Sequence, residues 1–168
     1  VFSQLYGQTE CYPVSVLRKS DHDARRPELF ASCGFPIASC NVSLRDDDNN
    51  EVAAGEAGEI CVRGPHAMEQ YWKRPEQTAE TFKGGWLHTG DIGILDANGN
   101  LRITDRLKDM YIVGGFNCYP AEVERILTAH PAIAQVAVIG VPDERQGEVG
   151  KAYVVLRAGT TLDTAGLI

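Results

Sequence analysis

The sequence predicts an α+β protein in two parts, a β-rich first part and a smaller second part of strands and one helix. Short β-branched segments separated by turn-forming clusters dominate the first part. From Lys108 onward the pattern changes to a strand, a well-marked helix and two further strands. We therefore place a domain boundary within residues 105–108, and assign residues 1–107 to the first domain and residues 108–168 to the second.

The first part contains the patterns of short strands, one helix and one hairpin. The helix is expected over residues 75–82, because Pro75 suits the first helical turn and acidic residues follow it. The dipeptide Asn98-Gly99 stands between two apolar runs, which predicts a β-hairpin. The acidic run over residues 46–50 predicts a solvated turn, and we assign no metal to it. Strands are expected over residues 13–17, 42–44, 59–63, 92–95 and 101–104.

The second part predicts a β-α-β-β unit. Its helix begins at Pro120, presents an apolar face that includes Val123 and Leu127, and ends at His130-Pro131. Strands are expected over residues 110–113, 132–141 and 152–156, the last two buried because they are almost wholly apolar. Residues 160–168 resemble the start of a helix, and the chain has no initiator Met, as expected of a chain cut from a longer protein.

Composition and charge exclude several classes of protein. A hydrophobic share of 43% and a charged share of 23% are typical of soluble globular proteins. The net charge of -7 argues against a nucleic-acid binder, which needs clustered Lys and Arg. No apolar run approaches the ~18 residues that span a membrane. The five cysteines show no spacing typical of a zinc site, so we expect a reducing, cytoplasmic setting.

A first candidate site is the pentapeptide over residues 6–10. The ring of Tyr6 could stack on a base, and Gly7 could let the backbone approach a ligand. The hydroxyl of Thr9 could bind a phosphate, and the carboxylate of Glu10 could hold Mg²⁺. Taken alone, such a pentapeptide is more often a surface turn.

A second candidate site is the segment over residues 86–91. Asp91 directly follows Gly90 and leads into a strand, a place where its carboxylate can accept hydrogen bonds from ribose hydroxyls. His88 lies beside Trp86 and Leu87, and a single histidine in such a setting is more often a packed, hydrogen-bonded residue than a catalyst. We therefore do not assign it to the site.

A third candidate site is the alternating-charge segment over residues 105–109 and the glycine pair that follows it. Alternating charges between two domains usually form a solvated linker, whereas Gly114 and Gly115 suggest a backbone that passes close to another group. Gly150-Lys151 resembles the end of a phosphate-binding loop. It lacks the preceding glycine at the required offset and enters a strand, so we exclude it.

The order and spacing of these segments resemble one family, the adenylate-forming superfamily of acyl-CoA synthetases, firefly luciferase and peptide-synthetase adenylation domains. Residues 6–10 resemble its aromatic-Gly-x-Thr-Glu motif, and residues 58–64 its Gly-Glu-rich strand. Residues 89–91 resemble its ribose-binding motif, and residues 105–124 its hinge region. Within the superfamily, residues 105–124 and 139–143 are most similar to bacterial fatty-acyl-CoA and steroid-derived-acid CoA ligases.

The resemblance implies a role for each nucleotide-binding residue. Tyr6, next to Gly7, would stack on adenine, Thr9 would contact phosphate and Glu10 would coordinate Mg²⁺. The ribose would be held by Asp91 and Arg106.

The resemblance also implies an architecture. The chain would be the C-terminal, β-rich part of the large domain, joined by a hinge to a truncated small domain. Lys108 would be the hinge residue, and Gly114 and Gly115 would line the passage for the pantetheine arm of coenzyme A. In the family, a phosphate-binding loop precedes these motifs and a catalytic lysine follows them, so we expect the chain alone to be inactive.

The implied function is that of an ATP-dependent acyl-CoA synthetase, which uses ATP, Mg²⁺ and coenzyme A. It would activate a carboxylic acid, fatty or steroid-derived, as acyl-AMP and transfer it to coenzyme A. Two alternatives stay open: a peptide-synthetase adenylation domain, which transfers to a carrier protein, and a non-catalytic module that keeps the scaffold. The resemblance places most of the acyl pocket before Val1, so these residues do not indicate the acyl chain length. A homo-oligomer is also left open.

Overall fold

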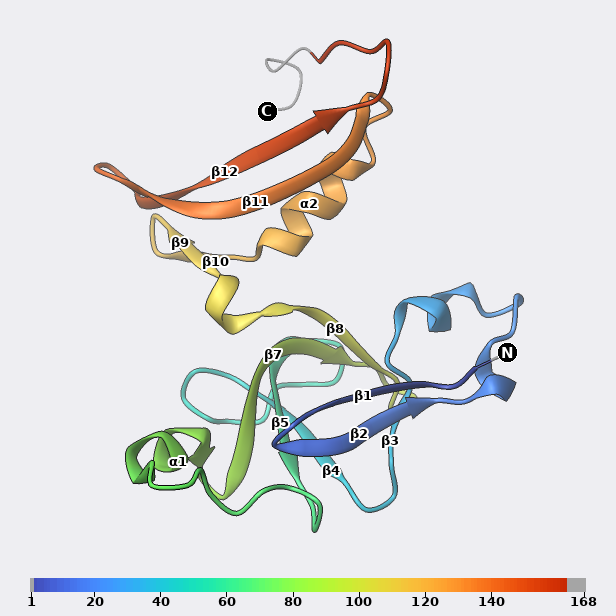
Figure 1. The fold of residues 1–168 in the computed structure, drawn as a ribbon, viewed down its shortest axis with the longest axis vertical. Helices are drawn as coiled ribbons and strands as arrows, with labels where there is room; N and C mark the ends of the chain where they lie inside the picture. The colour runs from blue at the N-terminus through green and yellow to red at the C-terminus, as the bar shows by residue number, and fades with distance from the viewer. Residues whose placement is uncertain (1, 163–168) are drawn as a thin grey trace. The chain divides into compact units, whose positions relative to one another are not determined.

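The computed structural model describes residues 2–162 and divides into two compact units (Figure 1). The first unit is Val1–Thr104 and the second is Asp105–Ile168. This division lies next to the segment in which the sequence placed the domain boundary. The helix expected from Thr160 onward lies mainly in residues 163–168, outside the described residues.

The first unit begins with a three-stranded antiparallel sheet. Its order is β1-β2-β3, and two 3-10 helices lie between β2 and β3. The predicted strand over residues 13–17 is part of β2, whereas β1 and β3 were not predicted. The elements are β1 (Gln4–Gln8), β2 (Cys11–Leu17), η1 (Lys19–Asp21), η2 (Pro27–Ala31) and β3 (Phe35–Pro36).

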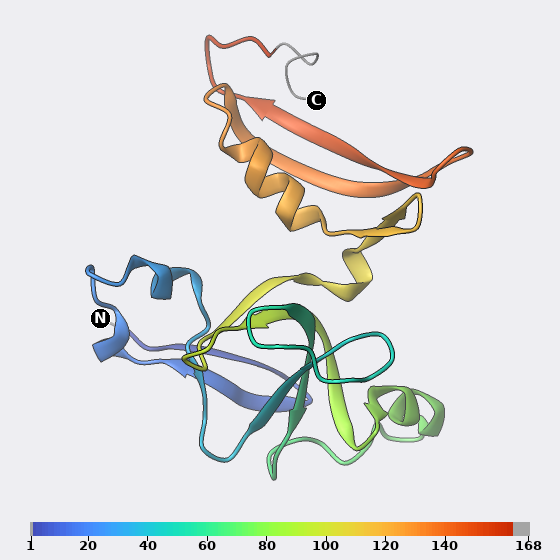
Figure 2. The ribbon, with the colours of Figure 1, turned by 180° about the vertical axis from the view of Figure 1, so that it is seen from behind.

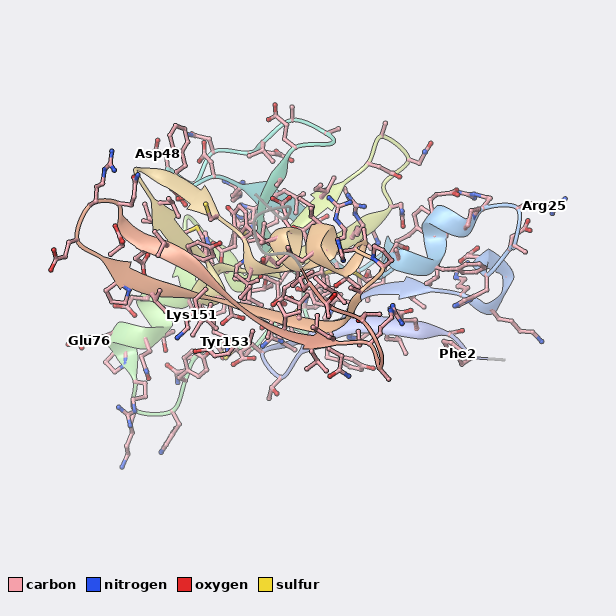
Figure 3. All side chains as sticks on the ribbon, turned by 90° about the horizontal axis from the view of Figure 1, so that it is seen from above. Phe2, Arg25, Asp48, Glu76, Lys151 and Tyr153 are labelled. Carbon is pink, nitrogen blue, oxygen red and sulfur yellow. The ribbon has the colours of Figure 1, made fainter. Side chains whose placement is uncertain are left out.

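A five-stranded sheet completes the first unit, in the order β4-β5-β7-β6 with β8 also paired to β7. The predicted hairpin is confirmed: β7 and β8 flank the Asn-Gly turn, where Gly99 has φ 78°. The acidic run is an exposed turn, and Figure 3 labels Asp48 within it. The elements are β4 (Asn41–Arg45), β5 (Ala57–Arg63), α1 (Pro75–Thr81), β6 (Phe82–Lys83), β7 (Trp86–Leu95) and β8 (Leu101–Arg106).

One hydrophobic core joins the two sheets of the first unit. It draws on almost every strand, so that β1 and β2 are packed against β5, β7 and β8. Each fully buried leucine or isoleucine contributes about 1.5–3 kcal/mol relative to an exposed one. The core residues are Tyr6, Cys11, Val14, Cys33, Cys40, Leu44, Ile60, Val62, Leu87 and Leu101.

The second unit is a four-stranded antiparallel sheet with one helix. The sheet order is β10-β9-β12-β11, and Figures 1 and 2 show α2 lying along β11. The last two predicted strands are longer than expected and form one hairpin. The prediction that they are buried is wrong: only Ile133 and Val138 of β11 are buried and no residue of β12 is, because α2 packs along β11 and covers only part of the sheet. The short strand β10 was not predicted. Gly150-Lys151 lies inside β12, which agrees with its exclusion as a phosphate-binding loop. In the same strand the amine of Lys151 lies 5.1 Å from the ring centroid of Tyr153 (Figure 3).

The elements of this unit follow the predicted order apart from β10. They are η3 (Leu107–Asp109), β9 (Tyr111–Val113), β10 (Phe116–Cys118), α2 (Pro120–Thr128), β11 (Ile133–Asp143) and β12 (Gly147–Leu156). Among the described residues of either unit, no helix is both long enough and apolar enough to cross a membrane.

Candidate functional site

Tyr6 and Asp91, predicted to contact adenine and ribose, lie in contact with each other. Tyr6 is on β1 and Asp91 on β7, and the Tyr6 hydroxyl donates a hydrogen bond of 2.9 Å to Oδ2 of Asp91. The Tyr6 side chain is only 9% exposed. Burial, together with the nearby Asp91 carboxylate, raises the Tyr6 pKa far above its ordinary value, so the phenol stays a donor at neutral pH. Because so little of the ring is exposed, its stacking on adenine stays a prediction.

The turn that carries Asp91 is fixed by hydrogen bonds on both sides. The Thr89 hydroxyl donates to the carbonyl oxygen of Ile60 at 2.7 Å and accepts from the Asp91 amide at 3.2 Å. Gly90 has φ 73°, a left-handed conformation that favours glycine. Its amide donates to Oε1 of Glu59 at 2.9 Å. The backbone around the predicted ribose-binding carboxylate is therefore held in one conformation.

His88 is a packed, hydrogen-bonded residue, as expected from the sequence. Its side chain is 11% exposed, and Nδ1 lies 2.6 Å from Oε2 of Glu59. The thiol of Cys61 lies 3.4 Å from the same nitrogen. Glu59 therefore binds both sides of the turn, a role that sequence reasoning missed because its partners lie about 30 residues further along the chain.

Glu10, the predicted Mg²⁺ ligand, is held by a tyrosine from a distant loop. Tyr71 donates its hydroxyl to Oε1 of Glu10 at 2.8 Å, and the Met68 amide donates to the Glu10 carbonyl at 2.7 Å. Burial, followed by this hydrogen bond, raises the Tyr71 pKa. The oxygens of a carboxylate are hard ligands of the kind that Mg²⁺ prefers. Thr9, its neighbour in the turn between β1 and β2, is exposed.

Gly7 is required by the fold of this hairpin. A Cβ at Gly7 would lie 2.7 Å from Cδ2 of Tyr12 and 2.9 Å from the carbonyl oxygen of Cys11. The register of β1 and β2 shifts between Tyr6 and Gln8, so Gly7 lies at an irregularity in the pairing of the two strands. The close approach that the sequence suggested is therefore made by the chain itself, and the approach of a nucleotide stays a prediction.

The predicted ribose and hinge residues of the second unit follow Asp105, to which the sequence assigned no individual role within the third candidate site. Arg106 and Lys108 are exposed, whereas Asp105 is buried. Asp105 accepts from the Arg106 amide at 2.7 Å and from the Ala121 amide at 2.9 Å. It thereby satisfies an amide in the first turn of α2. Asp91 belongs to the other unit, so joint binding of one ribose by Asp91 and Arg106 stays a prediction.

The paired glycines form the two-residue turn between β9 and β10. Gly114 has φ 56° and Gly115 has φ 90°, as a tight hairpin turn requires. The Gly114 amide donates to the carbonyl oxygen of Gln146 at 3.0 Å. Turn geometry alone therefore accounts for both glycines, and their place beside the pantetheine arm stays a prediction.

The second unit contains a cleft of about 520 Å³ lined in part by carboxylates. Besides Asp105, Glu124 accepts from the Val138 amide and Glu148 from the Ile112 amide, each at 2.8 Å. These carboxylates hold the helix and strands of the unit together. Lys108, the predicted hinge residue, lies at the same cleft.

Cys11, Cys40 and His66 come together although they are far apart in the sequence. One potential ligand atom from each lies within 4.8 Å of the others. Both cysteines belong to the hydrophobic core. Burial, followed by the neighbouring Cys11, raises the pKa of Cys40 to about 12, so its thiol is neutral near pH 7. A search for closely spaced Cys and His residues in the sequence does not find this group, because its three members are far apart along the chain.

Two family models and several relatives match the chain. The AMP-binding enzyme model matches residues 1–72, and the model of the AMP-binding enzyme C-terminal domain matches residues 122–167. The medium/long-chain-fatty-acid–CoA ligase FadD8 of Mycobacterium tuberculosis is 48% identical over 97% of this chain and 28% of its own length. The 3-[(3aS,4S,7aS)-7a-methyl-1,5-dioxo-octahydro-1H-inden-4-yl]propanoyl:CoA ligase of the same organism is 49% identical over 97% of this chain and 30% of its own length.

Solved structures agree with these matches. The amide bond synthetase McbA from Marinactinospora thermotolerans is 42% identical, with a TM-score of 0.83 over 98% of this chain and 34% of its own. The O-succinylbenzoate coenzyme A synthetase of Bacillus subtilis, in complex with ATP and a magnesium ion, is 39% identical, with a TM-score of 0.77 over 95% of this chain and 32% of its own. The chain therefore belongs to the AMP-binding, adenylate-forming enzyme family.

Proposed function

We propose that this chain is part of an ATP-dependent acid–thiol ligase, which activates a carboxylic acid as acyl-AMP and transfers it to coenzyme A. The hydrogen bond between Tyr6 and Asp91 carries the proposal, because it joins the two motifs expected to bind the nucleoside. The 48% identity to a fatty-acid–CoA ligase supports it. Because the chain spans about 28% of that relative, the activity is proposed for the longer protein.

The proposed reaction has two displacement steps. In the first, a carboxylate oxygen attacks the α-phosphorus of ATP and pyrophosphate leaves, which forms a mixed anhydride. In the second, the coenzyme A thiol loses its proton and attacks the acyl carbon, and AMP leaves. Charge that develops on the phosphate and carbonyl oxygens must be stabilised in each step. The two steps need different groups at one centre, which a domain rotation can supply.

The residues of the first unit would bind and orient ATP. Asp91 would accept hydrogen bonds from the ribose hydroxyls, Tyr6 with Gly7 would bound the adenine, and Thr9 would donate to a phosphate. Glu10 would hold Mg²⁺, which offsets the charge of phosphate oxygens when bound. The hydrogen bond from Tyr71 to Oε1 of Glu10 supports this role, because it fixes the direction of the carboxylate.

The residues of the second unit would act in ribose binding and in the change between steps. Arg106 would share the ribose with Asp91, and Lys108 would be the residue about which the second unit rotates. Its exposure supports this role, because an exposed side chain does not restrict backbone rotation by packing. Gly114 and Gly115 would leave room for the pantetheine arm, since neither has a side chain.

The proposed substrate is a carboxylic acid with a large apolar body, fatty or steroid-derived. The names of the two ligases from Mycobacterium tuberculosis, one for fatty acids and one for a bicyclic propanoyl group, support this class. The relatives from Mycobacterium and Salmonella also favour a bacterial protein. All five cysteines are free thiols, which supports a reducing compartment such as the cytoplasm.

The test is product analysis with the purified full-length protein. It is incubated with ATP, Mg²⁺, coenzyme A and each of a series of fatty and steroid-derived acids, and AMP and acyl-CoA are measured by chromatography. We expect one acyl-CoA for each AMP with at least one acid. Release of AMP that depends on none of the acids would contradict the proposal.

An amine is a second candidate acceptor of the acyl group, and one observation favours it: the chain is 42% identical to an amide bond synthetase. In such a reaction an amine replaces the thiol in the second step, and the first step is unchanged. Replacing coenzyme A with a primary amine in the same assay separates the two functions. A coenzyme A ligase gives thioester at a far higher rate than amide.

A further inference from the structure

The strands β5 and β7 are interrupted where the predicted ribose-binding turn lies. Glu59 pairs with Ile92 and Cys61 pairs with His88, so only Ile60 intervenes on β5. Three residues intervene on β7, at positions 89–91. A bulge of this kind breaks the ladder of backbone hydrogen bonds, so its amides need other acceptors.

Glu59 supplies one of these acceptors and holds the bulge from both sides. Its Oε1 accepts from the Gly90 amide at 2.9 Å, and its Oε2 lies 2.6 Å from Nδ1 of His88. The side chains of Glu59 and His88 are 16% and 11% exposed, so water competes little for these hydrogen bonds. Hydrogen bonds to a carboxylate are stronger than those between neutral groups. The two oxygens therefore fix the residues on both sides of Thr89.

The position of the Asp91 side chain depends on this bulge. Asp91 directly follows Gly90, and its carboxylate must meet the Tyr6 hydroxyl at 2.9 Å. The left-handed φ of Gly90 sets the direction in which the chain leaves the bulge. If the Gly90 amide loses its acceptor, the bulge can relax and the Asp91 carboxylate is no longer held in one place.

We propose that Glu59 is a positioning residue for nucleotide binding, acting through Gly90 on the Asp91 carboxylate. This inference rests on the proposed function, in which Asp91 binds the ribose of ATP. Glu59 itself need not touch the nucleotide. Because a ribose contact is the same before and during the reaction, loss of Glu59 raises KM for ATP and leaves kcat nearly unchanged.

A double-mutant cycle in the full-length protein tests the proposal. The apparent affinity for ATP is measured for the wild type, Glu59→Ala, Asp91→Ala and the double variant. Residues that act as a unit are strongly non-additive. We expect Glu59→Ala to raise KM for ATP ~5- to 10-fold in the wild-type background and less than ~2-fold in the Asp91→Ala background. Equal effects in both backgrounds, or no effect in the wild type, would overturn the proposal.

Glu56→Ala is the matched control. Glu56 precedes β5, is exposed, and also accepts a backbone hydrogen bond, from the Ala53 amide at 3.3 Å. Its carboxylate binds the turn before β5 and not the Gly90 amide, so its loss should change KM for ATP by less than ~2-fold. An effect as large as that of Glu59→Ala would show general loosening of the unit, and would overturn the specific role of Glu59.

Glu59→Gln keeps the test decisive if Glu59→Ala fails to fold. Its amide oxygen can still accept from Gly90, so we expect a smaller rise in KM, again absent in the Asp91→Ala background. Hydrogen exchange of the Gly90 amide in the 168-residue chain gives a reading that does not involve the enzyme reaction. Exchange of this amide should be slow in the wild type and in Glu59→Gln. The proposal would be overturned if the Gly90 amide of Glu59→Gln exchanged as fast as an amide in a turn without an acceptor.

Failure of this inference can be told from failure of the proposed function. If Asp91→Ala does not weaken ATP binding, the proposed function fails and the role of Glu59 falls with it. If Asp91→Ala weakens ATP binding but Glu59→Ala does not, only the positioning role of Glu59 is wrong.

Discussion

The hydroxyl of Tyr6 donates a hydrogen bond to Oδ2 of Asp91, 2.9 Å away and 85 positions along the chain. This contact links β1 to β7 and joins the two segments that the sequence singled out separately. The Tyr6 ring also belongs to the hydrophobic core, so the predicted nucleotide site and the core of the first unit share a residue. Substitutions here are therefore expected to affect both stability and binding.

Tyr6→Phe should destabilise the first unit with little change in packing. The ring is kept, and the hydroxyl is lost together with its hydrogen bond to the Asp91 carboxylate, which corresponds to about 1.5–3 kcal/mol. Urea unfolding of the 168-residue chain measures the loss. Tyr12→Phe is the control, because the Tyr12 side chain is 56% exposed, and it should change the free energy of unfolding by less than about 0.5 kcal/mol. Equal effects from the two variants would contradict the role of the Tyr6 hydroxyl.

Alkaline pH should lower the stability of the first unit. Burial, followed by the neighbouring Glu59, raises the pKa of Cys61 from its ordinary 9.0 to about 12. Burial also raises the pKa of Cys40 to about 12. Above pH ~9 the unfolded chain loses these protons while the folded chain keeps them, so the free energy of unfolding falls as the pH rises toward ~12. Below pH ~9 these thiols cause no such change.

Thermal unfolding measured across this pH range checks the sign. Tm should fall steadily above pH ~9 in the wild type. Cys40→Ala should have a lower Tm throughout but a shallower fall with pH, because one raised pKa is removed. A Tm that stays level or rises between pH ~9 and ~11 would contradict the raised thiol pKa values.

Gly115 offers a way to separate turn geometry from a place in the coenzyme A passage. A Cβ at Gly115 meets nothing within 4 Å, so Gly115→Ala suffers only from the left-handed φ of 90°, at a cost of about 1–2 kcal/mol. Asn tolerates this region better, so Gly115→Asn should recover part of the stability in urea unfolding. If the passage proposal is right, both variants raise KM for coenzyme A in the full-length protein. If KM for coenzyme A changes only in step with the loss of stability, turn geometry rather than a place in the passage accounts for Gly115.

Lys108→Pro in the full-length protein should separate the two half-reactions. Proline fixes φ near -65° and restricts the residue before it, so rotation about this point is blocked. We expect acyl-AMP formation to survive and single-turnover transfer from acyl-AMP to coenzyme A to be lost. Parallel changes in pyrophosphate exchange and in thioester formation would mean that Lys108 is not the hinge. Lys108→Ala is the control, since it removes the side chain and leaves the backbone free.

Much of the fold follows from local signals. The β7–β8 hairpin was predictable because Asn-Gly suits a tight turn, and α2 because Pro120 and His130-Pro131 mark its ends. The short strands β1, β3, β6 and β10 were not predicted, because two to five residues show little periodicity and, unlike β4 and β9, these four contain no β-branched residue. Their pairing is set by neighbours from elsewhere in the chain.

The candidate site shows the same division between local and long-range information. The residue types at Thr9, Glu10 and Asp91 suit nucleotide chemistry, but it was the order and spacing of the motifs along the chain that indicated it. The supporting contacts of Glu59, and of Tyr71 with Glu10, could not be predicted, because each depends on which strands or loops become neighbours. A glutamate on a strand is usually solvated, and only the bulge opposite it brings a backbone amide and the His88 ring to its carboxylate.

Acid-dependent exchange of pyrophosphate into ATP by the full-length protein tests the central claim, that these residues form the nucleotide site of an acid-activating enzyme. We expect exchange by the wild type, none by the 168-residue chain alone, and an apparent KM for ATP raised ~10- to 150-fold in Asp91→Ala, as loss of a charged acceptor worth about 1.5–3 kcal/mol implies. Asp48→Ala, in an exposed turn, should leave KM unchanged. Unchanged affinity for ATP in Asp91→Ala, or robust exchange by the 168-residue chain, would contradict the account.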